Sequence, residues 1–385
     1  MLSIELPLLA QYEQVRLYTL QLCHSLETED YTVQVVSFAS PIKWHLAHAT
    51  WFFEEFILVK IAGYRRFNSD YNFFFNSYYN VKGERVEQGG RGLSRPYLSE
   101  ILAYREHVDE AIRTYFSQIE DSFTRLLTLG LHHEQQHQEL ILMDLKYLLG
   151  TNPLQPDYPL RTWSEHTRKR NQTWLDIARG TYAFGHPEND EFGFDNEYPR
   201  HERIQPAAQV AGSNVLNGEY QEFVEAGGYN DPKYWSSDGW QWTQTEQVFH
   251  PLYWSLENGR WYEYTFFGKQ PLHPDRVVMH VSYHEARAYA KWKGLRLPTE
   301  FELEILHDRL DNGLVWEWTS SPYLEYPGYQ EPDDETGEYN AKFMVNQYVL
   351  RGGCVATPPG HLRATYRNFY RPTDRWCFAG IRLAR

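Results

Sequence analysis

Residues 131–140 read Leu-His-His-Glu-Gln-Gln-His-Gln-Glu-Leu, inside a run from about 122 to 149 whose apolar residues recur at helical spacing. His133 and His137 stand four residues apart, so a helix places both imidazoles on one face, within reach of a single ion. Leucines form a core-facing stripe on the same helix: Leu126, Leu127, Leu140, Leu142, Leu145 and Leu148. The stretch therefore predicts a buried helix of a bundle that carries half of a metal site.

A second helix with histidines is predicted from about residue 41 to 61. Ser40 is its expected N-cap, and Pro41 suits the first turn. His45 and His48 are three residues apart, so either imidazole can point towards the same neighbour. Three imidazoles from two helices leave open positions on an ion, as a catalytic metal requires. A chance pair of histidines without metal is the alternative, and the third histidine argues against it.

Composition limits the kinds of partner that the protein can have. The 385 residues suffice for two domains, and the net charge of -14 argues against a nucleic-acid surface. No segment is apolar for long enough to cross a membrane, and the N-terminus lacks the pattern of a signal peptide. The three cysteines, Cys23, Cys354 and Cys377, do not make a disulfide framework. We therefore expect a cytoplasmic protein, and homo-oligomerisation stays open.

The predicted fold class is α+β in two domains. Residues 1–150 form a helical bundle, 151–173 a linker rich in proline and polar residues, and 174–385 a mixed domain. Two further helices of the bundle are expected at about 6–28 and 97–118, which gives four helices with one long connection between the second and the third. That connection is rich in glycine, arginine and aromatic residues, which favours a functional loop over a disordered one.

The second domain shows short apolar runs broken by glycine. Strands are expected at 174–178, 180–185, 277–281 and 314–319, and helices at 217–226 and 283–293. Such a mixture predicts an α+β domain rich in loops.

Several motifs together resemble the sulfoxide synthases of ergothioneine biosynthesis. They are the His-Leu-Ala-His of 45–48, the His-Glu-Gln-Gln-His-Gln-Glu of 133–139, the Asn-Ser-Tyr-Tyr-Asn of 76–80 and the tail 365–376. In these non-haem iron enzymes a DinB-like helical bundle is fused to a domain like the formylglycine-generating enzyme. The resemblance implies that Fe(II) is bound by His48, His133 and His137. It makes His45, His132 and Glu139 neighbours of the metal, and Glu139 stays a candidate oxygen ligand.

The second domain carries motifs similar to the formylglycine-generating enzyme, which has a C-type-lectin-like fold. They lie at 180–185, 199–202, 294–300, 315–319 and 351–353. That enzyme works through a close pair of cysteines, whereas Cys354 and Cys377 are far apart in sequence. We therefore expect neither copper nor formylglycine chemistry.

The resemblance also implies substrate and catalytic residues. Tyr78 and Tyr79 would deliver a proton or hydrogen atom, with ordinary packing as the alternative. Arg85 and Arg91, and in the same loop Arg95, suit a substrate carboxylate, with a solvated arginine as the alternative. Hercynine, the trimethylated histidine, would be bound by Gln136 and Asn368, and its quaternary ammonium by aromatic faces. Candidates for those faces are Phe369, Tyr370 and Trp376, with packing in the core as the alternative.

The implied activity is O2-dependent C-S bond formation between hercynine and cysteine, coupled to sulfoxidation. γ-Glutamylcysteine or a selenium donor can replace cysteine in such enzymes, and we favour cysteine because a second carboxylate clamp cannot be assigned. A different class also stays open: a zinc-binding thiol transferase or a lectin-like binding protein. A zinc protein of that kind would consume no O2.

Overall fold

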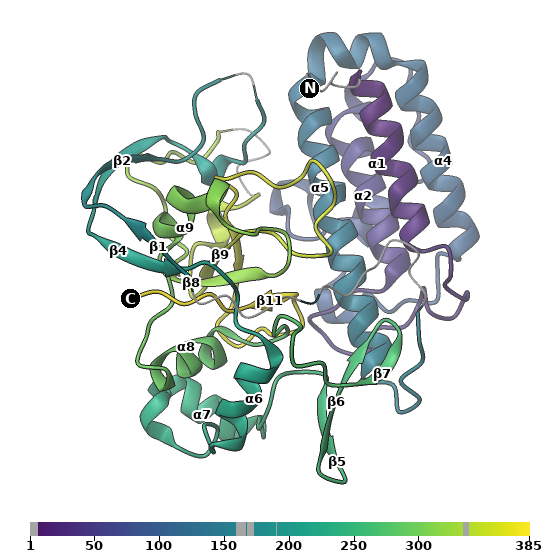
Figure 1. Cartoon of the computed structure of the whole chain (residues 1–385). Coiled ribbons are helices and arrows are strands. Elements are labelled where there is room, and N and C mark those ends of the chain that lie inside the picture. Colours follow the sequence, from purple (N-terminus) through teal and green to yellow (C-terminus); the bar gives the residue numbers. More distant parts are fainter. Residues whose placement is uncertain (1–6, 159–166, 168–172, 190, 334–338) are drawn as a thin grey trace. The chain divides into compact units, whose positions relative to one another are not determined.

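The structure is a computed structural model that describes residues 7–158, 167, 173–189, 191–333 and 339–385 (Figure 1). The chain divides into two compact units, residues 1–149 and 150–385. The first unit is helical and the second combines strands with helices, so the predicted two-domain α+β class is confirmed. Most of the predicted linker lies outside the described residues. None of the described helices is both long enough and apolar enough to span a membrane.

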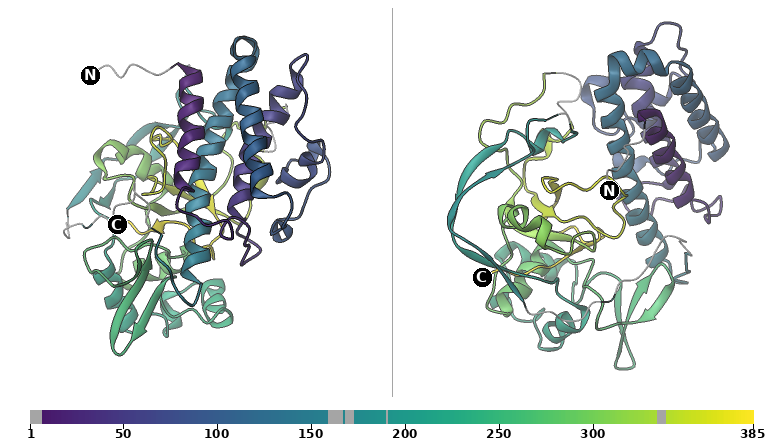
Figure 2. Two further views of the ribbon diagram at one scale, coloured as in Figure 1. Left: turned by 90° about the vertical axis from the view of Figure 1, so that its right-hand side faces the viewer. Right: turned by 45° about the horizontal axis from the view of Figure 1, so that its top comes forward.

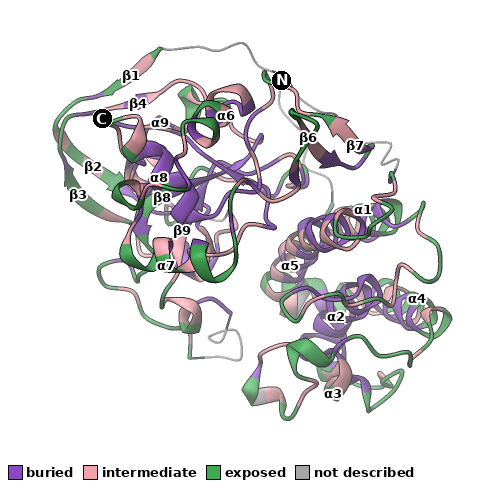
Figure 3. Cartoon of the chain, turned by 90° about the horizontal axis from the view of Figure 1, so that it is seen from below, coloured by how far each residue is buried: buried purple, intermediate pink, exposed green. Residues whose placement is uncertain are grey.

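Long helices run alongside one another in the first unit (Figures 1 and 2). They are α1 (Leu8–Leu22), α2 (Ile42–Phe56), α4 (Leu98–Thr114) and α5 (Phe116–Gly150), and the short α3 (Tyr71–Phe75) lies in the long connection. Every residue of α2 is buried, which makes α2 the central helix of the unit (Figure 3). A helix buried on all sides must find partners inside the protein for each of its polar side chains.

The ends of these helices differ from the prediction in several places, and α2, expected to reach about residue 61, ends at Phe56. α1 ends at Leu22, six residues earlier than expected. α5 begins at Phe116 and contains a kink at Phe123, whose backbone angles are not helical. Ser40 does not cap α2, so that prediction is wrong: its Oγ accepts a hydrogen bond from Arg91 Nη1 (3.0 Å), and its N–H donates to Asp144 (2.7 Å). These partners come from other parts of the fold, which local capping rules do not include.

The second unit contains small sheets and short helices. Its strands are β1 (Trp174–Ile177), β2 (Gly180–Phe184), β3 (His201–Gln205), β4 (Ala208–Ala211), β5 (Trp254–Glu257), β6 (Arg260–Thr265), β7 (Gly268–Pro271), β8 (Trp316–Pro322), β9 (Tyr348–Arg351), β10 (Asn368–Tyr370) and β11 (Ala379–Gly380). Its helices are α6 (Asn217–Glu225), α7 (Ser237–Thr245), α8 (Tyr283–Trp292) and α9 (Glu300–Leu306). Strands β10, β9, β8 and β11 form one sheet in that order, in which only the β8–β11 pair is parallel.

Most of the predicted elements of this unit match observed ones. The strand expected at 277–281 is wrong, because Val277 forms only an isolated bridge to Leu216 while Val278 and Val281 pack in the core. A short apolar run shows burial but does not by itself distinguish a strand from an irregular core segment. Cys354 and Cys377, like Cys23 in the first unit, are buried and form no disulfide.

Candidate metal centre

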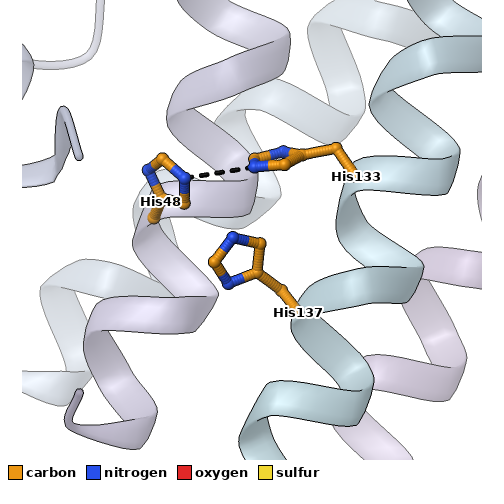
Figure 4. A group of neighbouring side chains, drawn as sticks. All are labelled: His48, His133 and His137. Carbon is orange, nitrogen blue, oxygen red and sulfur yellow. Dashed lines mark hydrogen bonds between the residues drawn. The ribbon is translucent and has the colours of Figure 1, made fainter. Parts of the chain in front are cut away.

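Three histidines of the first unit meet between α2 and α5 (Figure 4). His48, His133 and His137 each offer a ring nitrogen, and these nitrogens all lie within 4.8 Å of one another. The Nε2 atoms of His48 and His133 are 3.1 Å apart. His133 and His137 share a face of α5 because they are one helical turn apart, and α2 supplies His48. All three side chains are buried.

Burial keeps these imidazoles uncharged. It lowers the pKa of His133 to about 3 and holds the pKa values of His48 and His137 well below the usual range, with His133 adding to both shifts. Each ring therefore has a lone pair to donate at neutral pH. Three neutral nitrogen donors suit a divalent transition metal and would leave coordination positions open.

The surroundings of His48 fix the nitrogen that faces the cluster. Its Nδ1 lies 2.5 Å from the carbonyl oxygen of Phe75, and since a carbonyl only accepts, the hydrogen belongs on Nδ1. Nε2 is then left with its lone pair towards His133. Two nitrogens that each bind an ion at about 2.0–2.1 Å are themselves about 3 Å apart, so the observed separation fits a shared metal.

Aromatic side chains hold the imidazole rings in place. Trp44 and Trp51 stack on His48, with ring centroids 4.6 Å and 5.4 Å away. Phe52 lies 4.7 Å from the ring of His133. Such packing limits the rotamers of the ligands before any metal arrives, which lowers the cost of binding.

The two tyrosines of the long connection lie together at the wall of the bundle. Their hydroxyl oxygens are 3.5 Å apart. Tyr79 is fully buried and packs against Trp51 at 5.7 Å, so one aromatic ring separates it from His48. Tyr78 is partly exposed. Their catalytic role stays a prediction.

The arginines of the connection have different environments. Arg91 is buried beside Trp44, with its guanidinium 3.6 Å from the ring centroid, and burial lowers its pKa to about 10. Within the described part of the chain it forms no ion pair, and its Nε has no hydrogen-bond partner. Arg85, in contrast, donates to Asn80, and Arg95 lies exposed over the ring of Tyr97.

The remaining predicted site residues belong to different units. Gln136 is partly buried on α5. Asn368, Phe369 and Tyr370 form β10 of the second unit, where Phe369 stacks on Tyr323 at 4.2 Å. Trp376 is buried and packs edge-on against Tyr370. Substrate binding by these residues stays a prediction.

Sequence reasoning missed Asp144 and left His45 only as a neighbour. His45 Nε2 lies 3.0 Å from Asp144 Oδ2, and His45 Nδ1 lies 2.8 Å from His137 Nδ1. The signal was present in the spacing, because Asp144 follows His137 by two helical turns on the same face of α5. Glu139 is buried on α5 and does not belong to the three-histidine cluster.

Two family models match the chain. The model of the DinB superfamily matches residues 11–141. The model of the sulfatase-modifying factor enzyme 1-like domain matches residues 160–309 and 310–385. The two matches fall in the helical and the mixed part of the chain, as predicted.

Relatives with known names cover most of the chain. A hercynine oxygenase of Mycobacterium tuberculosis is 32% identical over 69% of this chain and 72% of its own length. A hercynine oxygenase of Mycolicibacterium thermoresistibile is 29% identical over 90% and 87%. Ergothioneine biosynthesis protein 1 of Schizosaccharomyces pombe is 27% identical over 52% of this chain and 29% of its own length. The chain therefore belongs to the hercynine oxygenase family, as a DinB superfamily domain followed by a sulfatase-modifying-factor-like domain.

Proposed function

We propose that this protein is a non-haem Fe(II) sulfoxide synthase of ergothioneine biosynthesis. It joins hercynine to cysteine through a C-S bond, oxidises the sulfur to a sulfoxide, and uses O2 as the oxidant. The observation that carries the proposal is the convergence of three neutral, buried imidazoles in a member of the hercynine oxygenase family. A three-histidine set leaves the open positions that a substrate and O2 need.

His48, His133 and His137 would hold the metal. Fe(II) bound there would supply the one-electron chemistry that activates O2 and would favour the thiolate form of the sulfur substrate. The protein adds rigidity, because the aromatic rings around the imidazoles limit their movement.

Arg91 would bind the carboxylate of the sulfur donor. A buried cation without an ion-pair partner is costly, and a substrate carboxylate would offset that cost with charge-assisted hydrogen bonds. Arg91 and His48 both contact Trp44, so the carboxylate would be held close to the metal ligands. Because Arg85 and Arg95 have other contacts, one buried arginine supports a donor with one carboxylate, which favours cysteine over γ-glutamylcysteine.

Tyr79, or Tyr78 beside it, would donate a proton while neutral. A phenol keeps its hydrogen at neutral pH and can pass it to a developing negative charge. Hercynine would be bound by Gln136 and Asn368. Its quaternary ammonium would lie against the aromatic rings of Phe369, Tyr370 and Trp376.

The electron balance closes without an external reductant. Forming the C-S bond from a C-H and an S-H group releases two electrons and two protons, and oxidising sulfur to the sulfoxide supplies two more electrons. One oxygen atom enters the product, and the other leaves as water.

The test is O2 uptake by protein loaded anaerobically with Fe(II) and given hercynine and cysteine, with mass spectrometry of the product. We expect uptake that needs both substrates. The product mass should equal their sum plus one oxygen less two hydrogens. γ-Glutamylcysteine and selenocysteine, given in place of cysteine, identify the donor.

The matched controls are the same protein loaded with Zn(II) and the His137→Ala variant, neither of which should consume O2. No uptake with any donor, by protein shown to hold iron, would refute the proposed function. It would then favour the zinc-binding or lectin-like alternative.

A further inference from the structure

We propose that a buried chain of hydrogen bonds, from Asp144 through His45 to His137, holds the His137 ring with its hydrogen on Nδ1 and its Nε2 lone pair available to the metal. The inference rests on the proposed function, because it assigns His45 and Asp144 as positioning residues for one ligand of that site. Neither residue belongs to the three-histidine cluster.

The direction of each hydrogen bond follows from the acceptor at the end of the chain. The Asp144 carboxylate only accepts when ionised, so His45 Nε2–H donates to Oδ2 across 3.0 Å. In the proposed tautomer, His45 Nδ1 accepts from His137 Nδ1–H across 2.8 Å. His137 is left with its lone pair on Nε2.

The chain of hydrogen bonds is enclosed and supported at both ends. His45 is 3% exposed, Asp144 6% and His137 8%. The N–H of Ser40 donates to the same Oδ2 of Asp144 at 2.7 Å, which holds the carboxylate towards His45. Low exposure strengthens each contact, because water cannot compete for the donors and acceptors.

The three residues join the two helices that supply the metal ligands. His45 precedes His48 by one turn of α2, and Asp144 follows His137 by two turns of α5. The ring of Trp44 packs near both His45 (5.7 Å) and His137 (6.2 Å). The contacts therefore set the position of His137 relative to α2 as well as its tautomer.

Ser40 connects these hydrogen bonds to Arg91, the residue proposed to bind the substrate carboxylate. Its Oγ accepts from Arg91 Nη1 at 3.0 Å, while its N–H donates to Asp144. One residue thus supports the group that would bind the donor carboxylate and the group that orients a metal ligand.

A hydrogen-bond partner on the far nitrogen of a ligating histidine fixes the tautomer and the ring orientation, and its removal costs roughly 10–100-fold in metal affinity. His48 has such a partner in the Phe75 carbonyl. For His137 the partner is another imidazole, which can itself adopt either tautomer. Asp144 removes that ambiguity, because an ionised carboxylate can only accept, which places the hydrogen of His45 on Nε2.

The experiment measures Co(II) and Fe(II) affinity of the metal-free, full-length protein by competition with a chelator, together with the Co(II) d–d spectrum. His45→Phe keeps a ring of similar size and removes both nitrogens. We expect its affinity to fall roughly 10–100-fold and its Co(II) spectrum to change. His45→Asn returns an acceptor near the Nδ1 position and should recover part of the affinity. A purely structural role for His45 predicts no such recovery.

Asp144→Asn is the second variant, since it keeps the size of the side chain and an oxygen that accepts but removes the charge. A loss of about tenfold, at the lower end of that range, is expected, with a smaller change in the spectrum. His107→Phe is the matched control: His107 is partly exposed on α4 and donates from Nε2–H to the Arg65 carbonyl, away from the cluster. Its affinity should equal that of the wild type.

Wild-type affinity and an unchanged spectrum in His45→Phe would overturn the inference, and so would tighter binding. If His45→Phe does not fold, the same results in Asp144→Asn overturn it.

Because metal binding is measured without substrates, the inference and the proposed function can be tested separately. A wild-type protein that binds no divalent ion refutes the proposed function, and the inference with it. A wild-type protein that couples hercynine to cysteine while the variants bind metal equally refutes the inference alone.

Discussion

Two neighbouring faces of α5 bury polar side chains in different ways. One face presents His133 and His137 to α2, with three neutral imidazoles gathered around one point. The other presents Glu134, which accepts from Arg16 Nη1 at 2.9 Å and from Thr19 Oγ1 at 2.6 Å. Arg105 donates to the same carboxylate.

The charges on the Glu134 face balance within the protein. Arg16 also pairs with Asp109 at 2.7 Å, so two arginines meet two carboxylates. Burial alone would raise the pKa of Glu134, but Arg105 and Arg16 hold it at about 2. The carboxylate therefore stays ionised with its partners in place, and the charges of this face balance without any ligand.

The histidine face is different, because the nitrogen lone pairs of three neutral imidazoles converge there instead of paired charges. Lone pairs of neutral imidazoles repel one another at short distance unless a hydrogen or a cation lies between them. One face thus holds the helices together, and the other is suited to an ion. Four predictions test whether the two faces differ in this way.

The largest effect is expected from His133→Ala or His137→Ala. A structural zinc ion gains about 10–16 kcal/mol from a full ligand set, so by analogy one ligand of three contributes about 3–5 kcal/mol. We expect a roughly 10²–10⁴-fold loss of Fe(II) affinity and loss of turnover. Iron content after gel filtration and chelator competition measure it. Retention of stoichiometric iron by either variant would remove that histidine from the ligand set.

Glu134→Gln should lower the stability of the protein and leave its Fe(II) affinity nearly unchanged. It leaves Arg16 and Arg105 buried without their carboxylate, which costs about 3 kcal/mol in the free energy of unfolding. Urea unfolding measures that loss, and Fe(II) affinity should stay close to that of the wild type below the unfolding transition. Glu13→Gln is the matched control, because Glu13 pairs with Arg113 at an exposed contact between α1 and α4. These are the helices that supply Arg16 and Arg105. Its cost should stay below about 0.5 kcal/mol. Equal costs for the two variants would show that the buried network does not stabilise the bundle.

Arg91→Met tests whether an unpaired buried cation serves a substrate. The free energy of unfolding should change little or rise, because no ion pair is lost and a buried charge is removed. The KM for cysteine should rise by a factor that corresponds to about 1.5–3 kcal/mol, while iron stays bound. Arg16→Met is the comparison, since it should lower the free energy of unfolding. An unchanged KM in Arg91→Met would assign the carboxylate to another residue.

Tyr79→Phe and Tyr78→Phe should have the smallest effect on binding and stability. Iron should stay in place, because neither phenol belongs to the cluster. The rate of sulfoxide formation and the ratio of products should change in the variant that lacks the proton donor. Product analysis by mass spectrometry measures both. If the two variants behave like the wild type, this pair of tyrosines does not deliver the proton.

The features that depend on spacing along the chain could be predicted from the sequence alone. The 3.6-residue period predicted the helices of the bundle and put His133 and His137 on one face, and the motifs predicted the family that the comparisons confirmed. These features are local, because the residues that define them lie within a few turns of one helix or within one short motif.

Which side chains meet across elements depends on the tertiary fold and could not be predicted from spacing. Spacing alone left His45 and His48 equivalent, whereas the fold turns His48 to the α5 pair and His45 to Asp144. It also buries Arg91, and it gives Ser40 hydrogen-bond partners outside α2 in place of the predicted role as the N-cap of α2. The reason is physical: a repeat pattern specifies which residues share a face, but the partner of that face is chosen by packing between segments distant in sequence.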